Sequence, residues 1–163
     1  MLRLATVADL EKILLIYEKA KKYMAQEGNS TQWDEQYPSR AILLEDIAKQ
    51  ELVVIEIANE IHGVFAYIIG EDETYQEMTN GEWLNDLPYG TIHRIASSFI
   101  YPGVLALAKE YALQQNNNLK IDTHPANKTM QAAILKQQFI YCGEIKAQDG
   151  SKRYAYQYYK EEK

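Results

Sequence analysis

The two histidines best suited to acid–base chemistry lie in or beside predicted strands. His93 falls inside the strand-like run 91–98, and His124 follows the apolar run 119–123, two residues after Asp122. Because imidazole changes its charge near neutral pH, His93 could act as a base and His124 as a substrate contact. The ordinary alternatives are a partly buried strand histidine and a loop histidine. Three histidines and one cysteine without ligand spacing predict no metal site.

The segment 71–90 is a long polar insert that places a carboxylate next to an aromatic ring, in Glu82 and Trp83. Such a pair can attract a cationic amine through charge and cation–π contact. The alternative is a solvated loop whose Trp83 folds onto the core. A long loop inside a compact domain is often functional, so both interpretations stay open.

A third chemical feature is the turn at Pro102 and Gly103. The strand-like run before it and the amphipathic pattern 104–115 after it predict that a helix begins there. Free backbone N–H groups and the positive end of the helix dipole then meet at one point, which favours an anion such as phosphate. Farther along the chain, Asn127 is placed to cap the next helix.

The composition is that of an ordinary globular chain, with 47% hydrophobic and 25% charged residues. We therefore expect a single domain spanning residues 1–163. The net charge of −6 argues against a nucleic-acid partner. The single cysteine excludes an intramolecular disulfide and fits a reducing compartment. Since there is no signal-peptide pattern and no apolar run of about 20 residues, we expect a cytoplasmic protein with no membrane partner.

Hydrophobic periodicity and turn residues predict a mixed order of strands and helices. The expected elements are strand 2–5, helices from Thr6 and Ser39, strands 52–58, 61–69 and 91–98, helix 104–115, strand 119–123, helix 127–137, and strands 139–145 and 153–159. Hairpins combined with a strand–helix–strand passage indicate an α/β fold. Its sheet should be mixed but mostly antiparallel, with about seven strands and helices on both faces.

Four stretches together resemble the Gcn5-related N-acetyltransferase (GNAT) superfamily over nearly the whole chain. Residues 2–10 (LRLATVADL) are similar to the family's opening, and residues 61–66 (IHGVFA) to its third strand. Residues 93–98 (HRIASS) stand where its fourth strand meets the cofactor, and Asn127 with Phe139 is similar to its last helix and strand. The resemblance implies transfer of an acetyl group from acetyl-CoA to a primary amine, on a small molecule or a peptide.

The resemblance also implies a place for the cofactor, coenzyme A. The strands 91–98 and 119–123 would part, and the pantetheine arm would lie in the gap. The implied cofactor contacts are Ile95, Ala96 and Ser97 for the arm, Gly103, Val104 and Leu105 for the diphosphate, and Asn127. His93 would be the catalytic base or a proton relay. The implied acceptor side holds Trp33, Tyr37, Glu82, Trp83 and His124, of which Trp33 and Tyr37 could equally be packing residues.

The chain departs from the family pattern at two places. The family turn R/Q-x-x-G-x-G/A falls on residues 100–105, where only Gly103 matches, and Leu105 replaces a small residue. In the last helix, Ile134 stands where the family often has a tyrosine as proton donor. Two rivals follow: a catalytically impaired module that binds a ligand or a partner, and a structural or regulatory domain that acts through its acidic surface.

The C-terminal run 153–159 is rich in tyrosine and alternates as a strand does. If this strand lies at the edge of the sheet, it could pair with a second copy of the chain. A homodimer is therefore a possible assembly.

Overall fold

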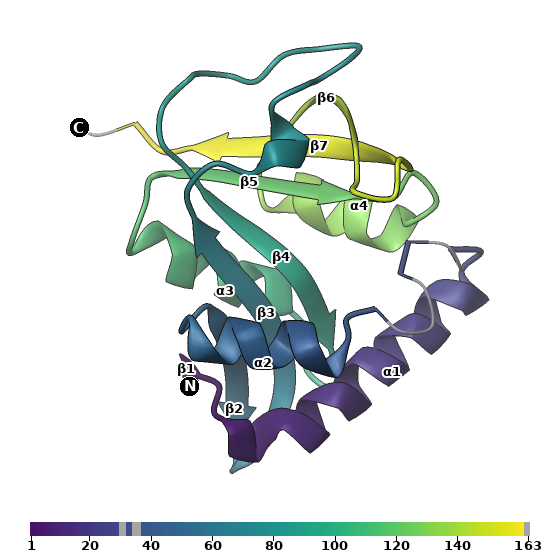
Figure 1. The fold of residues 1–163 in the computed structure, drawn as a ribbon, viewed down its shortest axis with the longest axis vertical. Helices are drawn as coiled ribbons and strands as arrows, with labels where there is room; N and C mark the ends of the chain where they lie inside the picture. The colour runs from purple at the N-terminus through teal and green to yellow at the C-terminus, as the bar shows by residue number, and fades with distance from the viewer. Residues whose placement is uncertain (30–31, 34–36, 162–163) are drawn as a thin grey trace.

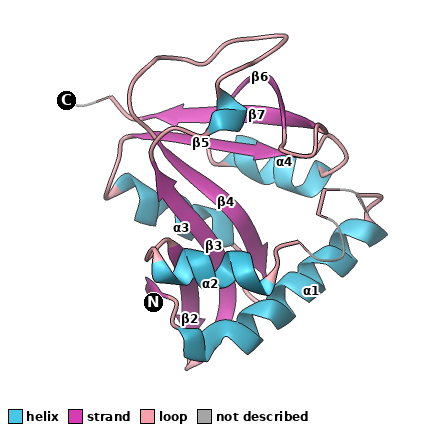
Figure 2. Cartoon of the chain, viewed as in Figure 1, coloured by secondary structure: helices cyan, strands magenta, loops and turns pink. Residues whose placement is uncertain are grey.

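A computed structural model describes residues 1–29, 32–33 and 37–161 of the chain. Seven strands form one sheet in the order β1-β2-β3-β4-β5-β7-β6, with helices on both faces (Figures 1 and 2). The strands are β1 (Leu2–Leu4), β2 (Leu52–Ile57), β3 (Glu60–Ile69), β4 (Gly90–Ser97), β5 (Asn118–Thr123), β6 (Ile140–Lys146) and β7 (Lys152–Tyr159). The helices are α1 (Leu10–Gln26), α2 (Arg40–Ala48), α3 (Val104–Leu113) and α4 (Lys128–Lys136), with short 3₁₀ turns η1 (Val7–Asp9) and η2 (Glu73–Tyr75). The predicted α/β fold with a mixed sheet is confirmed.

Alternation along the strands divides the core between the two faces of the sheet. On β2, Val53 and Ile55 pack with α3 and α4, whereas Leu52 and Val54 pack with α1 and α2. Successive side chains of a strand point to opposite faces, so one buried strand serves both layers. The central strands are therefore hydrophobic on both sides.

The predicted helix caps are present. At the entrance to α1, the Thr6 backbone N–H donates to Asp9 Oδ2 (2.8 Å) within a capping box. Ser39 Oγ accepts from the N–H of Ile42 (3.1 Å) and so begins α2. The hairpin between β2 and β3 turns at Ala58 and Asn59, whose positive φ values (52° and 66°) suit a tight two-residue hairpin turn. The turn predicted from the sequence, at residues 59–60, lies one residue later than the observed one.

The only parallel pairing in the described sheet is between β4 and β5, and it is short. It consists of Gly90 opposite Leu119 and Thr91 opposite Lys120. Past Thr91 the two strands part, as the resemblance implies. Arg94 lies at the bend of β4 with a φ of 52°, next to an irregularity in the β3–β4 register.

The insert 71–90 is folded against the sheet rather than extended into solvent. Its Thr79 pairs with Glu144 of β6 through two backbone hydrogen bonds of 2.9 and 2.8 Å. The insert also passes close to β6 at Gly81, where an added Cβ would lie only 1.7 Å from the Cys142 carbonyl oxygen. A small third core forms beneath it, around Tyr75, Tyr89, Ile145 and Ala155.

The predicted edge position of the tyrosine-rich strand is wrong. Strand β7 pairs with β5 on one side and with β6 on the other, so β6 is the outer strand. The reason is topological: the last hairpin folds back into the space beside β5. The homodimer stays a prediction, but pairing through an exposed β7 edge no longer supports it.

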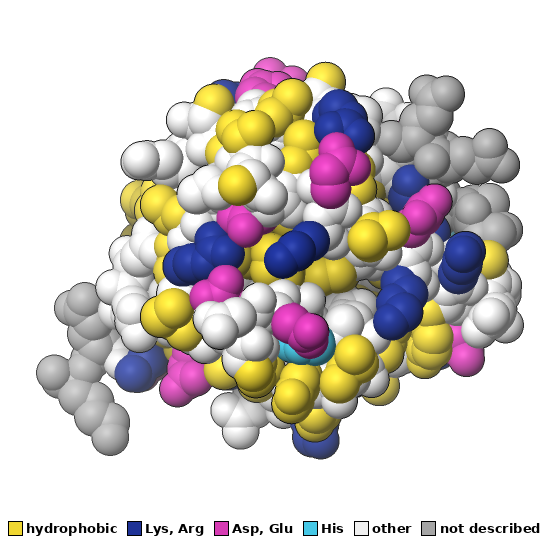
Figure 3. Space-filling view, turned by 90° about the horizontal axis from the view of Figure 1, so that it is seen from below, with side chains coloured by type: hydrophobic (Ala, Val, Ile, Leu, Met, Phe, Trp, Pro, Cys, Tyr) yellow, Lys and Arg dark blue, Asp and Glu magenta, His cyan; other side chains and the backbone are white. Residues whose placement is uncertain are grey.

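Basic and acidic side chains are mixed with hydrophobic ones on the face shown in Figure 3, so this face carries no broad field of one sign. Among the described residues, no helix combines the length and the apolar character that crossing a bilayer requires.

Candidate functional site

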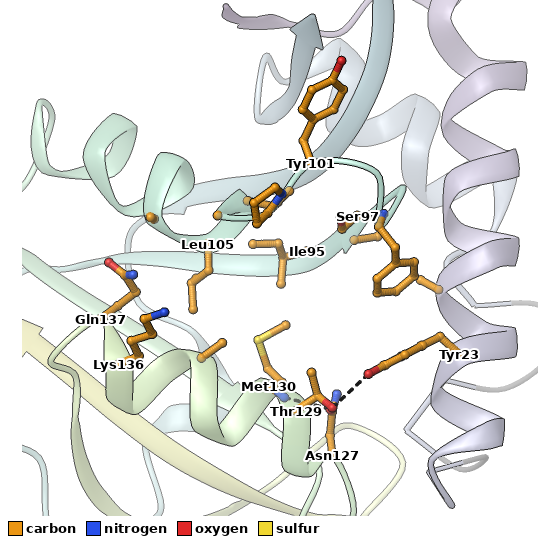
Figure 4. Close-up of a pocket in the computed structure, with 18 of the residues that line it drawn as sticks. Tyr23, Ile95, Ser97, Tyr101, Leu105, Asn127, Thr129, Met130, Lys136 and Gln137 are labelled. Carbon is orange, nitrogen blue, oxygen red and sulfur yellow. Dashed lines mark hydrogen bonds between the residues drawn. The ribbon is translucent and has the colours of Figure 1, made fainter.

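A cleft of about 460 Å³ opens where β4 leaves β5 (Figure 4). Its walls come from the end of β4, the following turn, the start of α3, α4 and one face of α1. All seven residues proposed for cofactor contact line it: Ile95, Ala96, Ser97, Gly103, Val104, Leu105 and Asn127. Its volume is within the usual range for a small-molecule site. Three segments that are distant in the sequence, within 20–24, 95–106 and 127–137, therefore build one cavity.

The start of α3 opens onto this cleft without a side-chain cap. Gly103 is the N-cap residue, with a φ of 86°, and no side chain of the described residues caps the helix. The earliest α3 amide with a backbone acceptor is that of Leu107, which donates to the Gly103 carbonyl oxygen (3.0 Å). Within the described part of the chain, the amides of residues 104–106 have no acceptor, as is usual at a helix N-terminus, where the helix dipole also favours negative charge.

The walls of the cleft are largely apolar. Ile95 and Leu105 face Met130 across it (Figure 4), and Ala133 also lines it. Leu105 is only 6% exposed because it also packs into the core between the sheet and α4. Leu105, which stands where the family turn has a small residue, is therefore also a core residue. The cleft suits a thin, mostly apolar ligand with an anionic end.

The end of the cleft next to α1 is closed by hydrogen bonds. Asn127 Oδ1 accepts from the Met130 N–H (3.1 Å), which confirms the predicted cap of α4, and its Nδ2 donates to Gln32 Oε1 (3.1 Å). The hydroxyls of Tyr23 and Thr129 are 3.2 Å apart (Figure 4). The sequence analysis missed Tyr23. Its signal was weak, a polar-tipped aromatic residue three positions after the buried Ala20.

His93 lies on β4 two residues before Ile95, outside the cleft lining. Its Nε2 is 3.0 Å from Asp72 Oδ2 in the insert. Burial alone would raise the pKa of Asp72, but hydrogen bonds from His93 and Thr74 lower it to about 2. Since an ionised carboxylate only accepts hydrogen bonds, Nε2 is the ring nitrogen that donates in this contact. The sequence did not indicate Asp72 as the partner of His93.

Further polar side chains surround His93 and Asp72 beneath the insert. The Tyr75 hydroxyl donates to Asp122 Oδ2 (2.5 Å), and Asp122 Oδ1 lies 3.9 Å from Arg153 Nε. The ring of Tyr75 lies 6.1 Å from that of His93, centroid to centroid. We call His93, Asp72, Tyr75, Asp122 and Arg153 the insert-side cluster. Within it, Asp72 is bonded to His93 and Asp122 lies near Arg153, whereas the buried Nη1 of Arg153 has no hydrogen-bond partner among the described residues.

His124 belongs to the turn between β5 and α4. Its Nδ1 accepts a hydrogen bond from the Ala126 N–H (3.0 Å). Burial, and to a lesser degree the positive charge of Arg153, lowers the pKa of His124. The structure does not place His124 in the cleft lining.

Trp83 packs on the third core, and its ring already contacts a cation of the same chain, the ammonium of Lys120. Lys120 Nζ lies 3.9 Å from the ring centroid of Trp83 and 3.8 Å from that of Tyr89. The Trp83 indole N–H donates to the Tyr75 carbonyl oxygen (2.8 Å). Burial lowers the pKa of Lys120 to about 8. Glu82 is exposed, and neither Glu82 nor Trp83 lines the cleft.

Trp33 and Tyr37 gather near the bend of β4. The ring centroid of Trp33 lies 5.6 Å from that of Tyr17 and 6.2 Å from that of Tyr37. Arg94 Nη1 donates to the Tyr37 hydroxyl (3.3 Å). Both side chains are described, whereas residues 30–31 and 34–36 of the same predicted loop lie outside the described part of the chain.

A buried ion pair, together with a hydrogen bond from a tyrosine side chain to the main chain, holds the bend of β4. Arg94 donates to both carboxylate oxygens of Asp46 in α2, at 3.0 and 2.9 Å. The Tyr17 hydroxyl donates to the Arg94 carbonyl oxygen (2.6 Å). The bend is thus tied to α1 and α2, and none of these three residues was singled out from the sequence as functional. Among the described residues, no group of three potential ligands could hold a metal ion.

Comparisons with known proteins give one consistent answer. No family model matches the chain, and no curated protein matches it. The crystal structure of a GNAT-family acetyltransferase from Streptococcus agalactiae is 32% identical, with a TM-score of 0.88, covering 99% of this chain and 96% of that one. A putative acetyltransferase from Staphylococcus aureus is 26% identical, with a TM-score of 0.72 and 98% of each chain covered.

The same fold recurs in a ribosomal-protein-alanine N-acetyltransferase from Brucella melitensis. That protein is 19% identical, with a TM-score of 0.66, and the match covers 98% of this chain and 99% of the other. This likeness concerns the fold alone. On the similarity to the streptococcal protein, which spans nearly the full length of both chains, this chain belongs to the GNAT family of acetyltransferases.

Proposed function

We propose that the protein transfers an acyl group, acetyl in the first instance, from a coenzyme A thioester to a primary amine of a small molecule or a peptide. The observation that carries this proposal is the uncapped start of α3 at Gly103, which opens onto an apolar cleft where β4 and β5 part. Family membership supports the same chemistry.

The cleft residues fit coenzyme A in three respects. The amides of residues 104–106 and the helix dipole suit its diphosphate. The apolar walls at Met130 and Ala133 suit the methyl and methylene groups of the pantetheine arm. Past Thr91, β4 has no strand partner on its β5 side among the described residues, so backbone groups of Ile95 to Ser97 can serve the amides of that arm.

His93 is the base or relay in this proposal. The bound thioester supplies the acyl group. For transfer to an amine, a bond forms between the amine nitrogen and the acyl carbon, the carbon–sulfur bond breaks, and the nitrogen loses a proton. In this proposal His93 Nδ1 takes up that proton, while Nε2 donates to Asp72. Trp33, Tyr37, Glu82, Trp83 and His124 remain proposed for the acceptor side.

A second candidate is a module that binds the ligand without turnover. It is favoured by Ile134, which occupies the position of the family's usual proton donor and is fully buried. A thiol is stable enough as its anion for transfer to proceed without that donor, so we rank this candidate second.

Calorimetry with acetyl-CoA, followed by a thiol-release assay on a panel of amines, tests the proposal. Saturable binding together with thiol release that depends on one of the amines supports the transferase. Saturable binding without release on any amine of the panel favours the binding module. No binding at millimolar acetyl-CoA contradicts both and leaves the structural or regulatory domain.

A further inference from the structure

The charges around the cleft are distributed in an unusual way. The chain has 23 acidic residues among 163, so an even spread would put about three among the twenty residues that line the cleft. All twenty are described, and none of them is acidic. One carries a full charge, and it is Lys136. A chain of net charge −6 therefore keeps negative charge away from this cavity, which indicates an anionic ligand.

Lys136 is well placed to meet such a ligand. It is the last residue of α4, it is exposed, and Figure 4 shows its side chain reaching toward the cleft across from Leu105. Nearby Lys109 is committed elsewhere: its ammonium donates to the Gln137 carbonyl oxygen (2.6 Å) and lies 3.7 Å from the ring centroid of Tyr158. Lys136 is thus the lysine that faces the cleft from the wall opposite the start of α3.

We infer that Lys136 neutralises a phosphate group at the nucleotide end of the ligand. This inference rests on the proposed function and adds a residue to it. At the family's turn position for Arg or Gln the chain has Ile100, an apolar side chain that cannot offset charge. Main-chain amides orient a phosphate but carry no net charge, whereas an ammonium is a compact charge that binds phosphate well. Lys136 supplies that charge from α4 instead of from the turn.

Calorimetry with coenzyme A on Lys136→Ala, with Lys128→Ala as matched control, tests the inference. Lys128 begins the same helix, is exposed and does not line the cleft. We expect Lys136→Ala to weaken binding roughly 3- to 10-fold at low salt. The deficit should shrink in about 0.5 M salt, because screening weakens the contact that the variant lacks. Lys128→Ala should bind like wild type, and all three proteins should unfold at similar temperatures.

The same titration with 3′-dephospho-coenzyme A identifies the phosphate. A deficit that persists assigns Lys136 to the diphosphate, and one that disappears assigns it to the 3′-phosphate. Equal affinity of Lys136→Ala and Lys128→Ala for coenzyme A overturns the inference while leaving the transferase proposal intact. A wild-type protein that binds neither form overturns both.

Discussion

The cleft beside α3 and the insert-side cluster both border β4, but they treat polar groups in opposite ways. The cleft leaves the amides of residues 104–106 without intrahelical acceptors and keeps carboxylates away. In the insert-side cluster, Asp72 is bonded to His93, and Asp122 to Tyr75. The difference separates a helix start whose first amides have no acceptor among the described residues from a cluster whose carboxylates are already hydrogen-bonded within the protein.

The contrast has a structural cause at the bend of β4. Where β4 leaves β5, one side of the strand loses its neighbour and opens as the cleft. The bend is held on the other side by the Arg94–Asp46 ion pair and the Tyr17 hydrogen bond. We call the cleft side of β4 the open side and the side held by Arg94, Asp46 and Tyr17 the paired side. The contacts of the paired side fix the bend on which the open side is built, and substitutions can be directed at either side.

The largest effect on stability is expected from Asp46→Ala. The ion pair with Arg94 is buried, with side-chain exposures of 7% and 13%, so the substitution strands a guanidinium away from water. We expect a loss of about 3–5 kcal/mol in the free energy of unfolding, measured by urea titration. The neighbouring Glu45→Ala removes an exposed pair with Lys49 and should cost far less. Similar losses in the two variants would mean that Arg94 finds water or another partner when Asp46 is gone.

His93→Ala should act on turnover rather than on folding. Loss of a proton acceptor is expected to lower the turnover rate by about 100-fold or more, while affinity for acetyl-CoA changes little because His93 does not line the cleft. The measurement is thiol release with the amine that the panel identifies, alongside calorimetry. Equal losses of rate and affinity in His93→Ala would remove its catalytic role.

Sequence reasoning recovered the features whose signals are local. Caps at Ser39 and Asn127, the hairpin turn and the start of α3 are each encoded within a few residues, and all seven proposed cofactor contacts line the cleft. The proposed cofactor contacts are different, because they came from the family resemblance and not from a local signal. The roles of those residues remain predictions.

Partners that are distant in sequence were not recovered. Arg94 and Asp46 are 48 positions apart, and His93 and Asp72 are 21 apart. Nothing local marks such pairs, because the topology of the sheet and the path of the insert decide which side chains meet. The position of β7 was mispredicted for the same reason: alternation identifies a strand, but not its neighbours in the sheet.

Gly103→Ala tests the open side directly, with Gly28→Ala as a matched control. Both glycines have left-handed φ values (86° and 82°), and an added Cβ would meet no atom within 4 Å at either position. Each variant should therefore lose about 1–2 kcal/mol in the free energy of unfolding from backbone strain alone. Only Gly103→Ala should also weaken acetyl-CoA binding, because it disturbs the amides at the start of α3. Unchanged affinity in Gly103→Ala would place the anion elsewhere.

Leu105 is a less suitable position for this test, since truncating its buried side chain would also open a core cavity.

The smallest expected effect concerns Lys120, a buried cation that contacts two aromatic rings. Lys120 lies between the rings of Trp83 and Tyr89, and burial lowers its pKa from 10.5 to about 8. Between these two pH values the unfolded chain binds the proton and the folded chain releases it, so this group makes stability rise as pH rises from 8 to 10.5. Below pH 8 the folded protein carries the full cost of a buried ammonium.

Lys120→Met removes that cost while keeping the length of the side chain. At pH 7 the variant should be more stable than wild type by about 1 kcal/mol, a modest gain because the two rings and water screening offset part of the desolvation cost. The advantage should shrink steadily as pH approaches 10, in urea titrations of both proteins at matched pH. Buried tyrosines such as Tyr17 will destabilise both proteins at the alkaline end, so the difference between them is the quantity to follow. If the stability difference between Lys120→Met and wild type stays constant with pH, the pKa of Lys120 is not lowered in the folded protein. The two rings would then stabilise the ammonium as well as water does.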